Sequence, residues 1–349
     1  MVLSKQSWRI AAFWGVVASV APYAVVKIAW LAGSQVGMRP GTGVGEMDTP
    51  RFVIGNILTT SMDLSAVVLA LALIQPWGRR LPAWSVIVVA GAATGLLAPI
   101  LIGVPLGSAL QLAIEGSVTS GGEGNLEGWM FAIIYGGFGL MAIALAILLA
   151  LYADDRWGDL IATGPRPPAH AVVTVFCGIG MLWFAAAMAY WGVFGPGTTG
   201  PAAMSSVAQR TVLIVTALAA AGGFLAPLLA RGSASRARPA ALVTWVGCAT
   251  TALQGPTGLL LAHDGQMSPL GVALAAVATP AAIVYGLAVL SSTLRRYRQA
   301  PRRKRAGSPP APTNESMEGR STTTSQPKGG SWPRGYTSAR PHRDPGSRS

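Results

Sequence analysis

Two residues that can carry charge lie inside strongly apolar stretches, where they could do proton or ion chemistry. Asp63 lies in the run Phe52–Ile74, and Lys27 lies in the run Ile10–Ala32. A charged side chain at the centre of a bilayer costs about 2.5–3.5 kcal/mol on insertion scales, so it must face protein or water. A carboxyl group in such surroundings can also stay protonated. These two residues are therefore the first candidates for an intramembrane polar site.

Helical spacing gives each of them polar neighbours. Asn56, Thr60 and Asp63 fall on one helical face of the second run, while Tyr23 and Lys27 fall on one face of the first. Asp63 lies about 16 Å below the start of its run, near the middle of the membrane. Since the two runs are consecutive and antiparallel, we expect a contact between Lys27 and Asp63, direct or through water.

Two interpretations of this pair remain open at the level of sequence. In the first, the pair is structural, or the lysine extends to the membrane surface beside a protonated aspartate. In the second, the two side chains form a substrate or proton site that opens outward. The candidate intramembrane site comprises Asp63, Lys27, Tyr23, Asn56 and Thr60.

Other signals for chemistry are weak. The chain has 2 cysteines, Cys177 and Cys248, and 3 histidines, with no zinc-binding spacing. The sequence contains no HExxH, Walker or GxSxG motif. We therefore predict no catalytic residue, no metal site and no cofactor, and we expect that the protein is not an enzyme.

The composition defines the elements that must position these residues. Of 349 residues, 51% are hydrophobic and only 11% are charged, against about 25% charged in an ordinary soluble domain. Mean hydropathy is +0.48. These values exclude a soluble enzyme domain, a disulfide scaffold and a disordered chain as descriptions of the whole. They predict an all-α, polytopic membrane helical bundle.

Eight runs are long enough to cross about 30 Å of hydrocarbon as helices. A barrel would need strands of alternating polarity, which the sequence lacks. The eight predicted transmembrane helices are Ile10–Ala32, Phe52–Ile74, Ala83–Val104, Trp129–Leu151, Ala171–Phe194, Thr211–Leu229, Ala240–Leu261 and Gly271–Leu290.

Basic residues give the orientation, because loops rich in Lys and Arg stay in the cytoplasm. One side carries Lys5, Arg9, Arg79, Arg80, Arg156, Arg166, Arg231, Arg236, Arg238 and seven basic residues within 295–305. The other side carries Arg39, Arg51 and Arg210, together with six acidic residues. We therefore expect a multi-pass protein of the cell (plasma) membrane with both termini cytoplasmic, which requires an even number of spans.

The two halves of the chain show a similar order of spans. At a constant offset of 157 residues, Pro99 matches Pro256 within a short series of shared residues. When Trp30 of the first span is matched with Trp191 of the fifth, Met188 stands at the position that corresponds to Lys27, and no acid corresponds to Asp63. We predict a parallel 4+4 repeat, with one four-helix half at 1–152, a cytoplasmic linker at 153–170, a second half at 171–294 and a disordered basic tail at 295–349.

The tail concentrates the charge of the chain. Residues 295–349 hold 13 of the 26 basic residues and only 3 of the 13 acidic residues. Beyond 305 the tail is rich in Ser, Thr, Pro and Gly, a composition typical of disorder. We expect anionic lipid headgroups to bind the cluster Arg295, Arg296, Arg298, Arg302, Arg303, Lys304 and Arg305. Nucleic-acid binding is not favoured, because the topology already requires positive charge here.

Three classes of function fit these features. The buried Asp63 and the repeated prolines favour a transporter-like or channel-like protein for a small solute. The lack of motifs favours a non-catalytic membrane subunit, sensor or scaffold, which could serve a membrane or ATPase partner subunit. A membrane-embedded enzyme is the third alternative.

The first span carries a resemblance. Pro22, Tyr23, Lys27, Trp30 and Gly33 make it similar to the opening span of uncharacterised multi-pass membrane proteins of high-GC Gram-positive bacteria. The resemblance covers this span alone and implies a multi-pass membrane protein without a particular activity.

The topology is testable with reporter fusions. Fusions after residues 80, 160, 235 and 300 should report a cytoplasmic location, and fusions near 42, 120, 198 and 265 should report the outside. The reason is the distribution of Lys and Arg between alternate loops. Paired alkaline phosphatase and fluorescent-protein fusions would measure it. A reversed result at any interior loop contradicts the eight-span arrangement.

Overall fold

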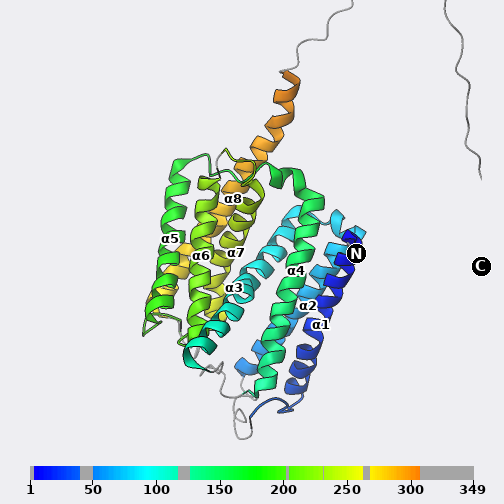
Figure 1. Cartoon of the computed structure of the whole chain (residues 1–349), viewed down its shortest axis with the longest axis vertical. Helices are drawn as coiled ribbons and strands as arrows, with labels where there is room; N and C mark the ends of the chain where they lie inside the picture. The colour runs from blue at the N-terminus through cyan, green and yellow to red at the C-terminus, as the bar shows by residue number, and fades with distance from the viewer. Residues whose placement is uncertain are drawn as a thin grey trace, which may run out of the picture. The chain divides into compact units, whose positions relative to one another are not determined.

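The computed structural model describes residues 4–39, 50–116, 126–201, 204–230, 232–261 and 268–306. Their secondary structure is helical apart from a single isolated β-bridge between Met38 and Leu126. The helices are α1 (Lys5–Leu31), α2 (Pro50–Ile74), the short 3₁₀ helix η1 (Pro76–Arg80), α3 (Ala83–Glu115), α4 (Gly128–Ala162), α5 (Ala171–Phe194), α6 (Val207–Leu229), α7 (Ala237–Leu261) and α8 (Pro269–Ala306). Figure 1 shows the long helices side by side in a bundle.

Seven of these helices, among the described residues, are long and apolar enough to cross a membrane. They are α1 to α6 and α8. A helix satisfies its backbone hydrogen bonds within one segment, which is the requirement that hydrocarbon imposes. The protein is therefore an integral membrane protein built as a helical bundle. The predicted span Ala240–Leu261 corresponds to α7, which is not among the seven.

Three helices extend well beyond their predicted ends. The predicted boundary of α3 was Val104, but the helix continues through Pro105 to Glu115. A proline inside a membrane helix is tolerated when neighbouring groups satisfy the carbonyl that it leaves without a donor. Similarly, α4 continues past Leu151 to Ala162, and α8 continues past Leu290 to Ala306. The last two extensions carry charged residues away from the apolar core.

The tail boundary predicted at 295 is wrong, because residues 295–306 belong to α8. Arg295, Arg296 and Arg298 of the predicted lipid cluster therefore project from a helix. The side chains of Arg302, Arg303, Lys304 and Arg305 lie outside the described residues, as do residues 307–349, for which disorder was predicted. The predicted linker 153–170 likewise begins inside α4.

The helices pack in two groups that share α3. In the first group, α1, α2 and α4 pack together around a core that includes Val16, Leu69 and Leu145. In the second, α6 packs against α3, α5 and α7, and the buried Tyr285 of α8 donates a hydrogen bond to the carbonyl of Phe224 on α6. Figure 1 shows α3 running between the two groups.

The contacts between helices differ between the two halves of the chain. Extensive contact joins α6 to α7, but the corresponding pair, α2 and α3, touches only marginally. In addition, α3 packs closely against α6 of the second half. The parallel 4+4 repeat therefore stays a prediction.

A stripe of small residues lets α3 approach its neighbours. Gly91, Gly95, Pro99, Gly103 and Gly107 recur every four residues on one face of α3. A Cβ on Gly95 would lie 2.4 Å from the carbonyl oxygen of Ala249 on α7, and one on Gly107 would lie 2.6 Å from the carbonyl oxygen of Ala208 on α6. Membrane helices associate through such close backbone packing, because lipid is as apolar as their side chains.

This stripe predicts opposite effects on stability for two matched Gly→Ala variants. Gly→Ala inside a helix is normally stabilising by about 1 kcal/mol, because alanine has the higher helix propensity. Gly95→Ala should instead destabilise by about 1–3 kcal/mol, since the new methyl group overpacks the α3–α7 contact. Gly139→Ala on α4, where a Cβ meets nothing within 4 Å, is the control. Unfolding in mild detergent measures both, and equal effects would contradict the close contact.

Candidate functional site

The predicted contact between Lys27 and Asp63 is present. Lys27 Nζ on α1 donates a hydrogen bond to Asp63 Oδ2 on α2 at 2.7 Å. The two residues are buried, with relative exposures of 0% for Lys27 and 6% for Asp63. The contact forms because α1 and α2 are consecutive, pack directly and each present a polar face to the other. It joins two opposite charges within the apolar interior.

Tyr23 completes the surroundings of the ammonium group. Lys27 Nζ lies 4.0 Å from the centroid of the Tyr23 ring, which is four residues earlier on the same helical face. The electron-rich face of an aromatic ring attracts a cation, and the attraction grows when water is excluded. Lys27 is thus held by a carboxylate oxygen and a ring face.

A small cavity adjoins the aspartate. Its volume is about 10 Å³, the space of a single water molecule. It is lined by Ser19, Val20, Tyr23, Asp63, Ile134, Gly137, Phe138 and Met141. The cavity lies where α4 comes close to α1, because a Cβ on Gly137 would lie only 3.0 Å from the carbonyl oxygen of Ser19. The carboxyl group of Asp63 therefore faces a water-sized space on the α4 side.

The other two predicted members do not bond to the pair. Asn56 is buried, but its side-chain amide donates to the carbonyl of Phe52 on its own helix at 2.9 Å. The hydroxyl of Thr60 is buried and has no hydrogen-bond partner among the described residues. Polar residues of a membrane helix often bond to their own backbone, as Asn56 does here.

Aromatic side chains of α4 and α2 pack against Tyr23 and Trp30 of α1, and sequence reasoning missed them. The Tyr23 ring meets Phe138 edge-on with 5.9 Å between centroids, and Trp30 packs against Phe52 at 6.1 Å. Trp30 is itself buried, and its indole N–H donates to the carbonyl of Val36 at 2.8 Å. Periodicity shows that a residue lies on the polar face of its own helix. It does not show that α4 would be the helix that closes over α1 and α2.

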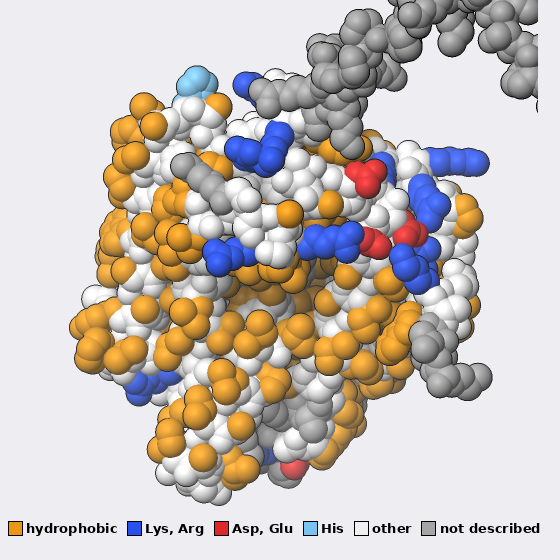
Figure 2. Space-filling model, turned by 45° about the horizontal axis from the view of Figure 1, so that its top comes forward, with side chains coloured by type: hydrophobic (Ala, Val, Ile, Leu, Met, Phe, Trp, Pro, Cys, Tyr) orange, Lys and Arg blue, Asp and Glu red, His pale blue; other side chains and the backbone are white. Residues whose placement is uncertain are grey.

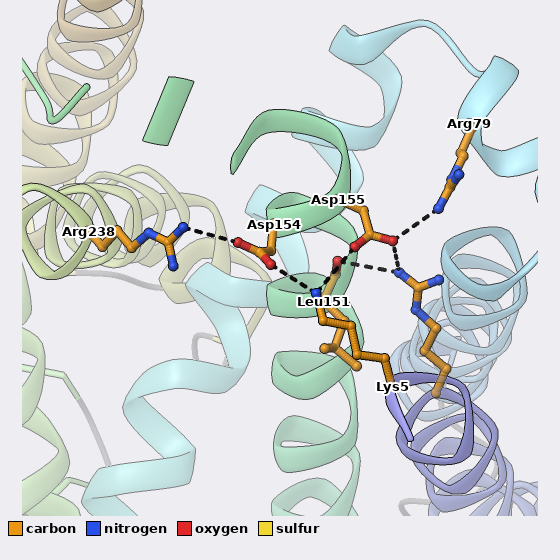
Figure 3. A network of polar contacts seen from close by, with 7 residues as sticks. Lys5, Arg79, Leu151, Asp154, Asp155 and Arg238 are labelled. Carbon is orange, nitrogen blue, oxygen red and sulfur yellow. Dashed lines mark hydrogen bonds and ion pairs between the residues drawn. The ribbon is translucent and has the colours of Figure 1, made fainter. Parts of the chain in front are cut away.

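A second polar centre lies at one end of the bundle, where α1 begins, and is called the basic end below. Asp155 of α4 accepts contacts from Arg9 at 2.5 Å and Arg79 at 3.0 Å, and its neighbour Asp154 pairs with Arg238 of α7 at 3.4 Å. Lys5 lies 3.3 Å from Asp154. Figure 3 shows the two carboxylates side by side on α4, each turned toward basic side chains of other helices.

The network ties four elements together at this end. Through Asp154 and Asp155, α4 is joined to α1, η1 and α7. Figure 2 shows basic side chains and the acidic groups gathered at this end above an apolar flank. Two adjacent acids directly after an apolar run, opposite several basic loops, are the sequence signal that could have revealed it. In the described part of the chain, no group of three His, Cys, Asp or Glu residues could hold a metal ion.

The buried pair is open to a double-mutant test. Asp63→Ala should destabilise by about 3–5 kcal/mol, because it leaves the ammonium of Lys27 buried without its counter-charge. Adding Lys27→Met should recover most of that loss, since no charge then remains to be desolvated. Asp154→Asn, which removes a partly exposed ion pair, should cost no more than about 1 kcal/mol. Unfolding in mild detergent of Asp63→Ala, Lys27→Met alone, the double variant and Asp154→Asn gives the four values, and additive single effects would show that the two charges are not coupled.

No protein family, curated protein or solved structure matches this chain. The function must therefore be inferred from the geometry of the two polar centres.

Proposed function

We propose that this protein is a transporter-like or channel-like protein for a small solute, with Asp63 as a protonatable centre paired to Lys27. The observation that carries this proposal is the buried 2.7 Å ion pair beside a water-sized cavity. An apolar pair of similar volume is often at least as stable as a buried ion pair. Stability alone is thus a weak reason to have charges at this depth, and a use for the charge is the better one.

The geometry supports a simple proton-linked step. A proton delivered through water in the cavity would bind Asp63 and remove the negative partner of Lys27. The ammonium of Lys27 would then keep only the face of the Tyr23 ring as an attractive contact. An unpaired charge in the apolar interior is costly, so α1 and α2 would rearrange, or an anionic group of a solute would take the place of the carboxylate.

The topology proposed with this function has eight spans and cytoplasmic termini. Helix α7 has 25 residues, which at 1.5 Å per residue gives about 37 Å, and it packs against α3 and α6. That length and packing support α7 as the remaining span. The gathering of basic residues at the end where α1 begins supports a cytoplasmic location for that end in the plasma membrane. The shared order of four helices per half supports the parallel repeat, although the packing of the halves differs.

A second candidate function, a non-catalytic membrane subunit or sensor, has one observation in its favour. The cavity at the buried pair holds no more than about one water molecule, whereas most ion pairs between described residues form at the basic end. A partner-dependent protein would use that end for contact, and the buried pair would then be structural.

Titration of Asp63 distinguishes the two candidates. Infrared difference spectra of the protein in lipid, recorded between alkaline and acidic pH, should show a carboxyl group that gains a proton, and Asp63→Asn should remove that signal. The proposal requires this proton uptake, because the carboxyl group of Asp63 borders the water-sized cavity. Glu115→Gln, an exposed change at the far end of α3, is the control for carboxyl loss.

Transport is tested on the same variants in liposomes that contain a pH-sensitive dye. Small cations, anions, sugars and amino acids added outside should include a solute that changes the internal pH with the native protein but not with Asp63→Asn. A folded Lys27→Met/Asp63→Ala double variant that transports the same solute as the native protein would contradict the proposal. An Asp63 carboxyl that never titrates would contradict it as well.

A further inference from the structure

A groove with a volume of about 430 Å³ opens at the basic end. It lies between the last turns of α4, the start of α7 and the part of α8 that follows its apolar run. Its wall comprises Asp154, Asp155, Arg156, Trp157, Gly158, Asp159, Leu160, Arg238, Leu294 and Tyr297. This volume lies within the range of roughly 300–1,000 Å³ that is usual for small-molecule sites.

The ends of the apolar runs put the groove at the depth expected for lipid headgroups. The apolar run of α4 ends at Leu151, and the lining residues follow within the next three turns. The helical path of α4 is interrupted at Trp157, whose backbone dihedrals are −132° and 15°. Tryptophan and tyrosine favour the boundary between hydrocarbon and water, where Trp157 and Tyr297 are expected from the ends of these runs.

Most charges in the wall are already engaged. Asp155 is paired with Arg9 and Arg79. The guanidinium of Arg156 donates to the hydroxyl of Tyr152 and to the carbonyl of Leu81, and it covers the Trp157 ring at 5.2 Å from the centroid.

Two charges of opposite sign retain the capacity to bind a ligand. The carboxylate of Asp159 is exposed and has no ion pair or hydrogen bond within the described part of the chain. Arg238 contacts Asp154 through one nitrogen, and its side chain is 65% exposed. A guanidinium has five N–H donors, so Arg238 can still bind a phosphate. A ligand that matches this groove therefore carries one negative and one positive group.

We propose that the groove binds the headgroup of a zwitterionic aminophospholipid. The phosphate binds Arg238, the primary ammonium binds Asp159, and the first carbons of the acyl chains contact Leu160 and Leu294. Charge complementarity selects this occupant, because three carboxylates and two guanidiniums line the wall and an anionic headgroup would meet the unpaired Asp159. A choline headgroup has no N–H to donate to Asp159, and Arg156 already covers a face of the Trp157 ring.

The proposal goes beyond the transport function, because the lipid would bind at the ion pairs of the basic end. Arg238 is the α7 side of the Asp154 pair that joins α4 to α7. A phosphate that draws Arg238 toward the groove competes with Asp154 for the same guanidinium. The lipid would thus set the strength of the link between the two helix groups at this end.

The test measures lipid retained by the full-length protein after reconstitution in equal mixtures of ethanolamine, choline and glycerol phospholipids, by native mass spectrometry. The native protein should retain the ethanolamine lipid about tenfold over the choline lipid, the effect of one hydrogen bond to a charged group. Asp159→Asn should abolish this preference, and Arg238→Gln should reduce retention of every phospholipid.

Matched controls keep the result specific. Arg236→Gln removes an exposed arginine that lies two residues before Arg238 and does not line the groove. Glu115→Gln removes an exposed carboxylate at the C-terminal end of α3. Neither should change retention, and thermal unfolding checks that all four variants fold.

Several results would overturn the proposal. These are preference for the glycerol lipid, equal retention of choline and ethanolamine lipids, and variants that behave like their controls. Stabilisation by soluble phosphoethanolamine without retention of the lipid would identify a free solute as the ligand instead. The readout is independent of transport, so failure here leaves the role of Asp63 untouched, and failure of the transport test leaves the groove untouched.

Discussion

Hydrocarbon offers no hydrogen bonds, and this constraint governs every level of the structure. The backbone must satisfy itself, which makes the spans helical. Apolar side chains gain little by leaving lipid for the protein interior, so the helices associate through close backbone contacts instead. Gly95 and Gly107 on α3 show how this is achieved, since neither has room for a methyl group. Because hydrocarbon cannot hydrogen-bond to a charged group, Lys27 and Asp63 pair with each other.

The two polar centres differ in how much stability is lost when one charge of a pair is removed. Lys27 and Asp63 are removed from water, so each strongly depends on the other, and losing either leaves a costly buried charge. The carboxylates of Asp154 and Asp155 are partly exposed and share several cations, so each contact contributes little alone. The interior pair is thus the one in which the loss of a single charge has the larger effect on stability. The outer network is suited to a link that ligands or lipids can adjust.

Helix α3 connects the two groups of helices. It packs on α6 and α7 through its glycine stripe and also contacts α4, whose end carries Asp154 and Asp155. The indole N–H of Trp245 on α7 donates to the hydroxyl of Thr94 on α3 at 3.1 Å, adding a polar contact between the helices. A movement of α4 relative to α7 would therefore involve α3 as well. This shared helix is the reason that the two groups do not separate at the midpoint of the chain.

The sequence by itself determined the class of protein, the approximate positions of the spans and the partnership of Lys27 with Asp63. Hydropathy identifies the segments that are apolar enough to lie in lipid. A modest loop between two consecutive helices keeps them next to each other. Only the tertiary structure decided that α4 closes over this pair, that α3 continues past Pro105 and joins the second group, and that Asp154 and Asp155 collect cations from three other elements. Contacts between helices far apart in the chain depend on the shapes of their faces. In an apolar chain, the residues that face lipid and those that face protein look alike in sequence.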